Sequence, residues 1–223
     1  GINSIAKMAR KFGLGDISGI EIENEAHGLV PDKKWKKNNR NENWHLGETM
    51  IAGIGQGYVL TTPLQIAVMA ARMVNGGYSV KPTIVRDAKS ISYDAGEITF
   101  PKVDVSDSSM EIILKCMNQV TNHPAGTAYS SRINMYGMEM GGKTGTSQVR
   151  RIYERERADD YKKEEKPWIE RDHALFVGYA PVKDPKFVVS VVVEHGGSGS
   201  TKAAPIARDI LMEIQRRNKK YIA

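Results

Sequence analysis

The chain has 223 residues, a formal net charge of +6 and an apolar content of 40%. These values are typical of an ordinary globular protein and exclude a disordered or collagen-like chain. No apolar run is long enough to cross a bilayer as a helix, and a single cysteine excludes both an internal disulfide and a cysteine-based metal cluster.

Patterns in the first half predict two helices separated by a strand and a long loop. Residues 4–12 have the pattern of a helix that ends in a Gly-Leu-Gly turn. The alternation in residues 19–23 predicts a short strand, and the polar residues 24–48 predict a loop. Thr62 can cap a second helix whose first residue is Pro63. Because this helix carries almost no charge, we expect it to be buried nearly all round.

Basic residues gather within the expected loop, where residues 33–40 read KKWKKNNR. A basic cluster can attract nucleic acid, but no RNA-binding or helix-turn-helix pattern accompanies this one. We therefore expect these residues to be solvated loop, and we expect no nucleic-acid partner.

The second half of the chain predicts a small antiparallel sheet with helices packed on it. Residues 107–122 have the pattern of a helix that a Ser-Asp pair caps, and residues 202–217 have the pattern of a final helix. Residues 173–181 and 186–197 have the pattern of strands, and the Asp-Pro pair between them predicts the turn of an antiparallel hairpin. One α/β (α+β) unit over residues 1–223 is the simplest architecture.

Each of these two helices carries an apolar stripe that we expect to face the core. On the first helix the stripe consists of Ile112, Ile113, Cys116, Met117 and Val120. On the second helix it consists of Ala203, Ile206, Ile210, Leu211 and Ile214. Cys116 is therefore expected to be a buried structural thiol.

One motif carries the chemistry: residues 137–149 read GMEMGGKTGTSQV. From Gly137 the run matches the phosphate-loop pattern, whereas from Lys143 it reads K-T-G-T, a strand signature of enzymes whose serine attacks a peptide carbonyl. A phosphate loop needs an apolar strand before its first glycine and a helix that starts at its lysine. The preceding residues are polar, and Gly145 is a poor residue for a first helical turn. A phosphate-loop NTPase stays the alternative from another class, because a VVVE run ending at Glu194 imitates a Walker B strand.

An edge strand that faces a cleft explains the same residues differently. Because its glycines lack side chains, another backbone can approach the strand and pair with it. Lys143 supplies a positive charge that can hold an anion and ease the loss of a proton from a serine hydroxyl. Thr144 and Thr146 offer hydroxyls to a substrate carboxylate, and the N–H near Thr146 can stabilise an oxyanion. The candidate catalytic residues are Lys143, Thr144, Gly145 and Thr146, and the candidate substrate-binding residues are Gly142, Thr144, Thr146 and Ser147.

Six segments, taken together, resemble the penicillin-binding transpeptidases. They read, in chain order, GLGDISGIEI, AGIGQGYVLTTPLQIAVMAA, NHPAGTAYSS, GGKTGTSQV, DHALFVGYAP and VVSVVVEHGG. Their order and spacing are similar to those of the class B enzymes, and of the penicillin-binding protein 2 group in particular, over nearly the whole chain. The resemblance implies a serine β-lactamase-like fold and a peptidoglycan D,D-transpeptidase. Such an enzyme cross-links stem peptides through a serine acyl-enzyme, and β-lactams acylate it.

The resemblance also implies the surroundings of the enzyme. It implies the periplasmic face of the bacterial inner membrane, with the anchor outside these residues, and no cofactor or metal. It implies a SEDS-type glycosyltransferase and the cell-elongation machinery as partners. A β-lactamase or a carboxypeptidase is the alternative within the fold, and a non-catalytic binding fragment is a further alternative.

Two motifs of the family, S-x-x-K and S-x-N or S-x-D, have no match in the expected context. Ser4–Lys7 spells the first and Ser92–Asp94 the second, but we interpret the former as a helix surface and the latter as a turn. We therefore expect the nucleophile to lie upstream of Gly1, and we expect no acylation of this chain alone by penicillin. In the family an upstream strand flanks the counterpart of residues 186–194, so we expect these residues to pair with a second copy or with other residues.

Three other features each have two interpretations that the sequence leaves open. Gln56 and Gly57 either shape a turn or form a loop behind the cleft. The charged residues 150–172 form either a flap over the cleft or a solvated loop. His173 either orients a carboxylate such as that of Asp172 or has a structural role.

Overall fold

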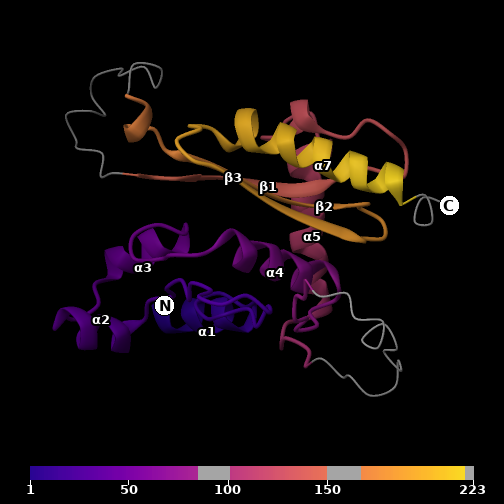
Figure 1. Cartoon of the computed structure of the whole chain (residues 1–223). Helices are drawn as coiled ribbons and strands as arrows, with labels where there is room; N and C mark the ends of the chain where they lie inside the picture. Colours follow the sequence, from indigo (N-terminus) through magenta and orange to yellow (C-terminus); the bar gives the residue numbers. More distant parts are fainter. Residues whose placement is uncertain (85–100, 150–166, 219–223) are drawn as a thin grey trace. The chain divides into compact units, whose positions relative to one another are not determined.

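The computed structural model describes residues 1–84, 101–149 and 167–218. The chain forms two compact units, Gly1–Met110 and Glu111–Ala223, and the boundary between them falls inside helix α5 (Asp107–Asn122) (Figure 1). Within the described ranges, no helix is both long and apolar enough to span a membrane.

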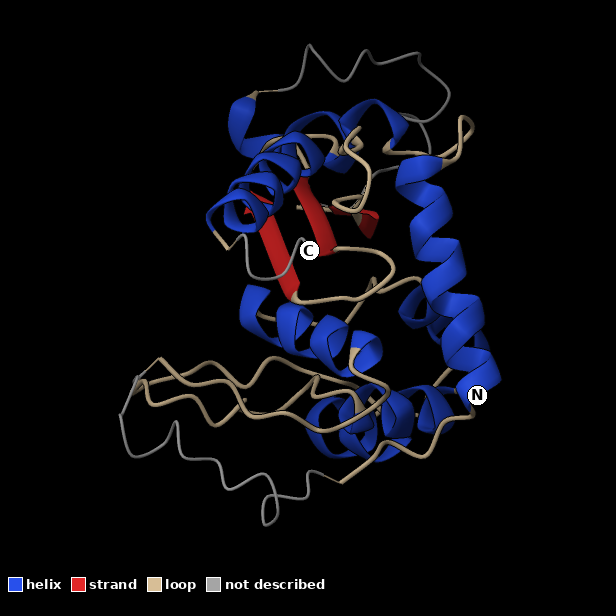
Figure 2. Cartoon of the chain, turned by 90° about the vertical axis from the view of Figure 1, so that its right-hand side faces the viewer, coloured by secondary structure: helices blue, strands red, loops and turns tan. Residues whose placement is uncertain are grey.

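The first unit consists of helices joined by long loops (Figure 2). Its helices are α1 (Ile2–Lys11), α2 (Lys33–Arg40), α3 (Leu46–Gly53) and α4 (Pro63–Val74). The predicted cap of α4 is confirmed, because the Thr62 side chain accepts the Gln65 N–H and the Gln65 side chain accepts the Thr62 N–H. Every residue of α4 except Pro63 is buried or half-buried, as its lack of charge predicted.

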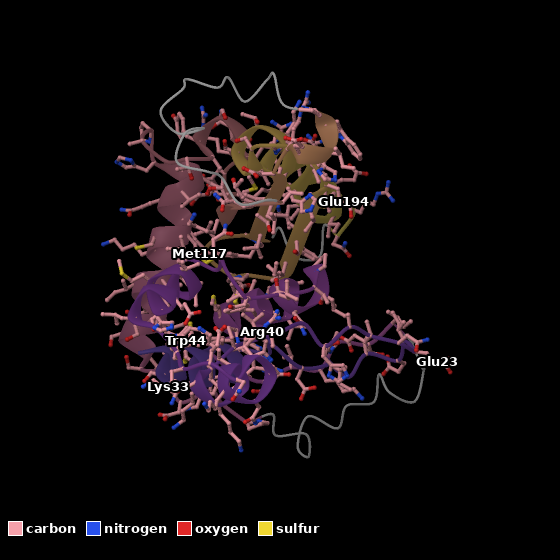
Figure 3. The ribbon with its side chains drawn as sticks, turned by 90° about the vertical axis from the view of Figure 1, so that its left-hand side faces the viewer. Glu23, Lys33, Arg40, Trp44, Met117 and Glu194 are labelled. Carbon is pink, nitrogen blue, oxygen red and sulfur yellow. The ribbon has the colours of Figure 1, made fainter. Side chains whose placement is uncertain are left out.

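The expectation of a loop over residues 24–48 is wrong, because α2 and the start of α3 lie there. Asp32 caps α2 by accepting the Trp35 N–H at 2.8 Å, and Asn41 ends the helix in the left-handed conformation (φ 52°). Lys36 is buried rather than solvated, and its ammonium pairs with the carboxylates of Glu48 and Glu42. Figure 3 shows the side chains of this unit, with Lys33, Arg40 and Trp44 labelled around α2.

The strand expected at residues 19–23 is also absent from the described structure. Gly19 (φ 80°) and Asn24 (φ 60°) bracket the segment in left-handed conformations that interrupt an extended chain. The Glu21 carboxylate accepts the Ile84 N–H at 3.3 Å instead, so a side chain rather than a strand ladder links these two loops.

The second unit is built on the antiparallel sheet that the sequence predicts. Its strands are β1 (Gly141–Ser147), β2 (His173–Ala180) and β3 (Phe187–Val193), in the order β1-β2-β3. Lys143 lies opposite Val177, and Ala180 lies opposite Phe187 across the predicted hairpin. The mixed fold class is confirmed.

Helix α7 (Ala204–Arg217) lies along one face of this sheet and follows directly on a π-helical turn, η4 (Gly199–Ala203) (Figure 1). Two short 3-10 turns, η1 (Tyr129–Ser131) and η3 (Trp168–Glu170), complete the described elements of the unit. The core between the sheet and the helices consists of Ala128, Ile133, Met138, Met140, Ala174, Phe176, Ala180, Val191, Ala203, Ala204, Ala207 and Leu211.

The inward faces of both long helices differ from the predicted stripes. On α7 the buried residues are Ala204, Ala207, Leu211 and Gln215. Ile206 and Ile210 are 44% and 40% exposed, because the alanine face allows the helix to approach the sheet more closely than an isoleucine face does.

On α5 the buried residues are Met110, Met117 and Thr121. Ile112 (63% exposed), Ile113 and Cys116 face outward, so the expectation of a buried thiol is wrong. The predicted cap of this helix is confirmed, because Ser106 Oγ accepts the Ser109 N–H at 3.2 Å.

Candidate active site

The K-T-G-T residues lie within strand β1, at the edge of the described sheet. A phosphate loop would place Lys143 at the start of a helix, so the nucleotide-binding alternative is wrong. All six predicted site residues, Gly142, Lys143, Thr144, Gly145, Thr146 and Ser147, are on this one strand.

The glycines of β1 are needed for packing against the neighbouring residues of the sheet. A Cβ at Gly142 would lie 2.4 Å from Phe176 Cζ, and one at Gly141 would lie 2.7 Å from the Tyr179 ring. A Cβ at Gly199 would lie 2.3 Å from Leu175 O and 2.5 Å from Gly145 O. Another backbone segment does approach Gly145 closely, as the sequence predicted. In this structure that segment is the start of η4, at Gly199.

The lysine and the first threonine of the motif have different surroundings. Lys143 is exposed, and its ammonium donates to the carbonyl oxygen of Thr144 at 2.8 Å. An ammonium has three donors, so this bond leaves two for a ligand. Thr144 is half-buried, and its hydroxyl lies 3.2 Å from the hydroxyl of Thr127. Thr146 is exposed, and Ser147 lies opposite His173.

The end of α5 fixes the residue that precedes β1. Thr121 Oγ1 donates to Met140 O at 2.6 Å, and Asn122 Nδ2 donates to the same oxygen at 2.8 Å. Together with Thr127, these residues support the strand that carries Lys143. Sequence reasoning missed this support, although the NHPAGTAYSS segment contains Thr127.

Of the two interpretations of His173, the structure supports the structural role. Its Nδ1 accepts the His195 N–H at 2.9 Å, and the two rings meet edge to face with centroids 4.7 Å apart. His195 Nδ1 donates to Arg171 O at 3.0 Å, and the Trp168 ring lies 4.4 Å from the His195 ring. Within the described residues, no group of three His, Cys, Asp or Glu side chains is placed to hold a metal.

The spelled matches to the other motifs fall outside any described site. Ser4 and Lys7 are exposed on α1, as the helix-surface interpretation expects. Ser92–Asp94 and residues 150–166 of the charged segment lie outside the described residues.

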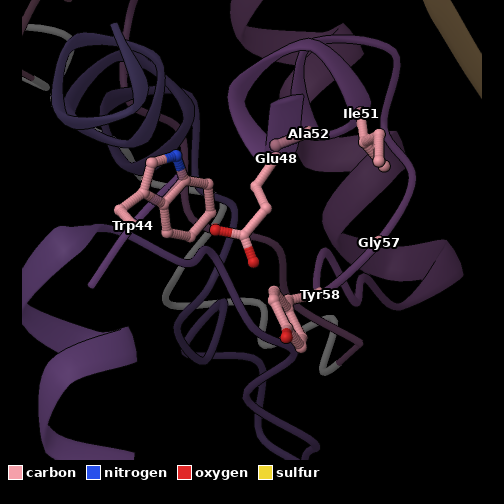
Figure 4. A pocket seen from close by; sticks show the side chains of 6 residues that line it. All are labelled: Trp44, Glu48, Ile51, Ala52, Gly57 and Tyr58. Carbon is pink, nitrogen blue, oxygen red and sulfur yellow. The ribbon is translucent and has the colours of Figure 1, made fainter. Parts of the chain in front are cut away.

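A pocket of about 190 Å³ lies in the first unit beside the predicted turn at Gly57 (φ 78°). It is lined by Trp44, Glu48, Ile51, Ala52, Gly57 and Tyr58, and the Glu48 carboxylate lies between the two aromatic rings (Figure 4). The His45 N–H and then Lys36 hold the pKa of Glu48 below its usual value, and Glu48 in turn raises the pKa of Lys36. Glu48 and Lys36 thus pair with each other, and Glu48 is a structural group of this pocket. The pocket therefore fits the interpretation in which Gly57 shapes a turn.

Sequence comparison supports the family resemblance. The family model for the penicillin binding protein transpeptidase domain matches residues 1–212. The peptidoglycan D,D-transpeptidase MrdA of Salmonella typhimurium is 32% identical over 216 residues, which are 95% of this chain and 34% of that protein. MrdA of Acinetobacter baumannii is 34% identical over 215 residues, which are 92% of this chain and 30% of that protein. The chain thus spans about a third of the length of the curated relatives it matches.

Solved structures share the fold. Pseudomonas aeruginosa PBP2, solved in complex with WCK 5153, matches with a TM-score of 0.76 and 32% identity over 96% of this chain and 44% of that chain. Helicobacter pylori PBP2, solved in complex with MreC, matches with a TM-score of 0.78 and 27% identity over 97% of this chain and 37% of that chain. Together with the K-T-G-T edge strand, these matches show that the chain belongs to the penicillin-binding protein transpeptidase family.

Proposed function

We propose that residues 1–223 are the C-terminal portion of one transpeptidase domain, and that the full-length protein is a peptidoglycan D,D-transpeptidase. The observation that carries this proposal is the position of K-T-G-T on an edge strand of an antiparallel sheet. An edge strand has backbone groups that an extended peptide can pair with, and the lysine and hydroxyls on it suit an anionic peptide end.

The residues of β1 have distinct roles in this proposal. The hydroxyls of Thr144 and Thr146 bind the terminal carboxylate of a stem peptide. Gly142 and Ser147 lie on the same strand and contact the bound peptide. Lys143 places a positive charge beside the serine and lowers the cost of removing its proton. The backbone N–H near Thr146 donates to the oxyanion that forms as the serine attacks.

The chemical step itself needs groups that lie upstream of Gly1 in the full-length protein. The serine oxygen forms a bond to the peptide carbonyl carbon, and the terminal residue leaves as a free amine that takes up a proton. The amine of a second stem peptide then attacks the acyl-enzyme, restores the serine and forms the cross-link. A β-lactam acylates the same serine and blocks it. We propose that this chain alone is not acylated, because the proposal places the attacking serine outside residues 1–223.

The location and partners of the full-length protein are a further part of the proposal. From the family resemblance we place the protein at the periplasmic face of the inner membrane, among the cell-elongation machinery, with a SEDS-type glycosyltransferase as a partner. The structure of Helicobacter pylori PBP2 in complex with MreC supports the expectation that the full-length protein has a protein partner.

The proposal is tested by penicillin labelling of the full-length protein. Lys143→Ala should slow acylation by about a hundredfold, since one preorganised charge at the reacting group has an effect of that order. The matched control is Lys186→Ala, which removes an exposed ammonium paired with Asp184, next to β3. Normal acylation of the Lys143 variant would contradict the assignment.

Two further measurements bear on the alternatives. Rapid hydrolysis of the penicilloyl adduct by the wild-type protein would favour a β-lactamase, whereas a slowly hydrolysed adduct supports the transpeptidase. An intact-mass adduct on a serine of this chain alone would refute the proposal that the nucleophile lies elsewhere.

A further inference from the structure

The second unit contains a pocket that the proposed chemistry does not use. Its volume is about 320 Å³, and its walls come from the last turns of α5 and the loop that follows. The lining residues are Cys116, Gln119, Val120, His123, Ala125, Gly126 and Thr127. The loop is held against the helix because the Ala128 N–H donates to Val120 O at 2.9 Å.

The lining of this pocket is rich in hydrogen-bond donors. His123 Nδ1 accepts the Ala125 N–H at 3.2 Å, so the ring carries its own proton on Nε2 when neutral. The Gln119 amide, the Thr127 hydroxyl and the Cys116 thiol supply further donors. Among the described residues that line the pocket, none is acidic. A carboxylate or a peptide carbonyl therefore meets donors here and no repelling charge.

The pocket adjoins the K-T-G-T strand through one residue. Thr127 lines the pocket, and its hydroxyl lies 3.2 Å from that of Thr144 on β1. Thr144 is the residue that we assign to the carboxylate of the stem peptide. A peptide bound at Thr144 therefore has this pocket within reach of its neighbouring residues.

We propose that the pocket is a binding subsite of the stem peptide. It binds a part of the peptide that is rich in hydrogen-bond acceptors and that precedes the C-terminal end held by Thr144 and Thr146. The inference rests on the proposed function, because it takes the ligand of β1 to be a stem peptide. The pocket adds binding energy from a part of the substrate that does not react, which an enzyme can use to raise the rate of the chemical step.

Cys116 makes occupancy of the pocket measurable without catalysis. In the full-length protein, the rate of N-ethylmaleimide addition to Cys116 is followed by mass spectrometry of the peptide that contains it. A stem pentapeptide at about ten times its Kd fills about nine-tenths of the sites, so labelling should slow about tenfold. A dipeptide with only the two C-terminal residues should not slow it. Equal labelling with and without bound pentapeptide would overturn the inference.

A pair of variants on the same helix gives a second test. Cys116→Trp fills the pocket, and Ile112→Trp places the same side chain at an exposed position of α5 outside it. For Cys116→Trp, the ratio of kcat/KM with the pentapeptide to the rate of penicillin acylation should fall about tenfold, as expected for a lost remote contact. Ile112→Trp should leave this ratio unchanged.

The outcomes separate the two proposals. If Cys116→Trp lowers peptide turnover and penicillin acylation by the same factor, the pocket is only structural and the inference fails while the proposed function stands. If penicillin does not acylate the wild-type protein, the proposed function fails, and pentapeptide protection of Cys116 then decides alone whether the pocket binds peptide.

Discussion

The two units of the chain are stabilised by different kinds of contact. In the second unit, a main-chain ladder and a continuous apolar cluster order the strands and α7. In the first unit, buried and half-buried polar side chains hold the loops to the helices. Gln65 donates to Asp16 O at 2.7 Å and to His27 O at 2.8 Å, and Arg72 donates to Lys11 O at 2.9 Å.

This difference determines which kind of substitution damages each unit. A sheet with aromatic rings packed on glycines tolerates little added volume, whereas loops bonded to side-chain amides tolerate little loss of polarity. We expect steric substitutions to have their largest effects in the second unit and polar deletions in the first.

The largest effect should come from an added methyl group at Gly199. In Gly199→Ala the new Cβ meets Leu175 O at 2.3 Å and Gly145 O at 2.5 Å, and neither backbone atom can move without disturbing β1 or β2. We expect the free energy of unfolding of the second unit to fall by about 3 kcal/mol. Urea unfolding followed by hydrogen exchange of the β1 and β2 amides measures it.

The matched control for this substitution lies in the first unit. Gly47→Ala on α3 adds the same methyl group where no atom lies within 4 Å, so it should leave stability unchanged or raise it by up to about 1 kcal/mol. An equal loss of unfolding free energy in Gly199→Ala and Gly47→Ala would contradict the expectation that steric crowding makes the second unit sensitive to added volume.

The next largest effect compares the loss of a buried glutamine in the first unit with the loss of one in the second unit. Gln65→Leu removes two donors from the loop carbonyls of Asp16 and His27, and should cost about 2–3 kcal/mol. Gln215→Leu removes donors from Met138 O and Leu211 O, but also removes a buried Oε1 that has no partner in the described structure. We expect it to cost about 1 kcal/mol or less. Thermal unfolding of the two variants tests the order, and a larger loss at Gln215 would reverse the comparison.

Acid should weaken the first unit through its bonded carboxylates. The Trp35 N–H lowers the pKa of Asp32, and the His45 N–H lowers that of Glu48. A lowered pKa in the folded state gives stability that is fully present above the unfolded-state value, about pH 4 to 4.5, and is lost as the pH falls through the folded-state value. Emission of Trp35 and Trp44 in a Trp168→Phe background should therefore change below about pH 4.

A variant of the cap tests this acid sensitivity. Asp32→Asn keeps a side chain that caps a helix but removes one titrating group, so the fluorescence change should become shallower with pH. An unchanged pH profile in this variant would show that another group causes the loss.

The smallest expected effect concerns β3, an edge strand of the described sheet, whose pairing through residues 186–194 stays a prediction. Edge lysines oppose strand pairing between copies, so Val192→Lys should weaken any self-association by about tenfold. Sedimentation velocity at several concentrations measures it, with Lys202→Ala, an exposed residue of η4, as the control. A wild-type chain that is monomeric at every concentration would remove the prediction.

Local patterns were enough to predict the strands of the second unit. Alternation and the Asp-Pro turn predicted β2 and β3, and K-T-G-T predicted β1, because strand faces and turns depend on neighbouring residues. In the first unit, two helices had such a local signal: α1 in the Gly-Leu-Gly turn that follows it, and α4 in the cap formed by Thr62 and Gln65. Helix α2 was missed because the burial of Lys36 depends on Glu48, which lies in a different helix.

The same limit applies to the candidate site. The six residues of β1 were found from the motif, but Thr127 and the outward face of Cys116 were not. Apolar periodicity predicted Cys116 inside, whereas the bonds of Thr121 and Asn122 to Met140 O orient α5 with polar groups against the sheet. A hydrogen bond between segments that are 18 residues apart, such as that of Asn122, leaves no periodic signal in the sequence.

The crowding around the glycines of β1 restricts how this chain can change during evolution. A Cβ at Gly141 or Gly142 would clash with an aromatic ring, and a Cβ at Gly199 would clash with the backbone of Gly145, so few replacements at these three positions leave a foldable sheet. A lineage under selection by an inhibitor that binds this strand would have to vary the hydroxyl-bearing positions, Thr144 and Thr146, or the α5 wall beside them. We expect resistance substitutions to accumulate on that wall and to spare the glycines.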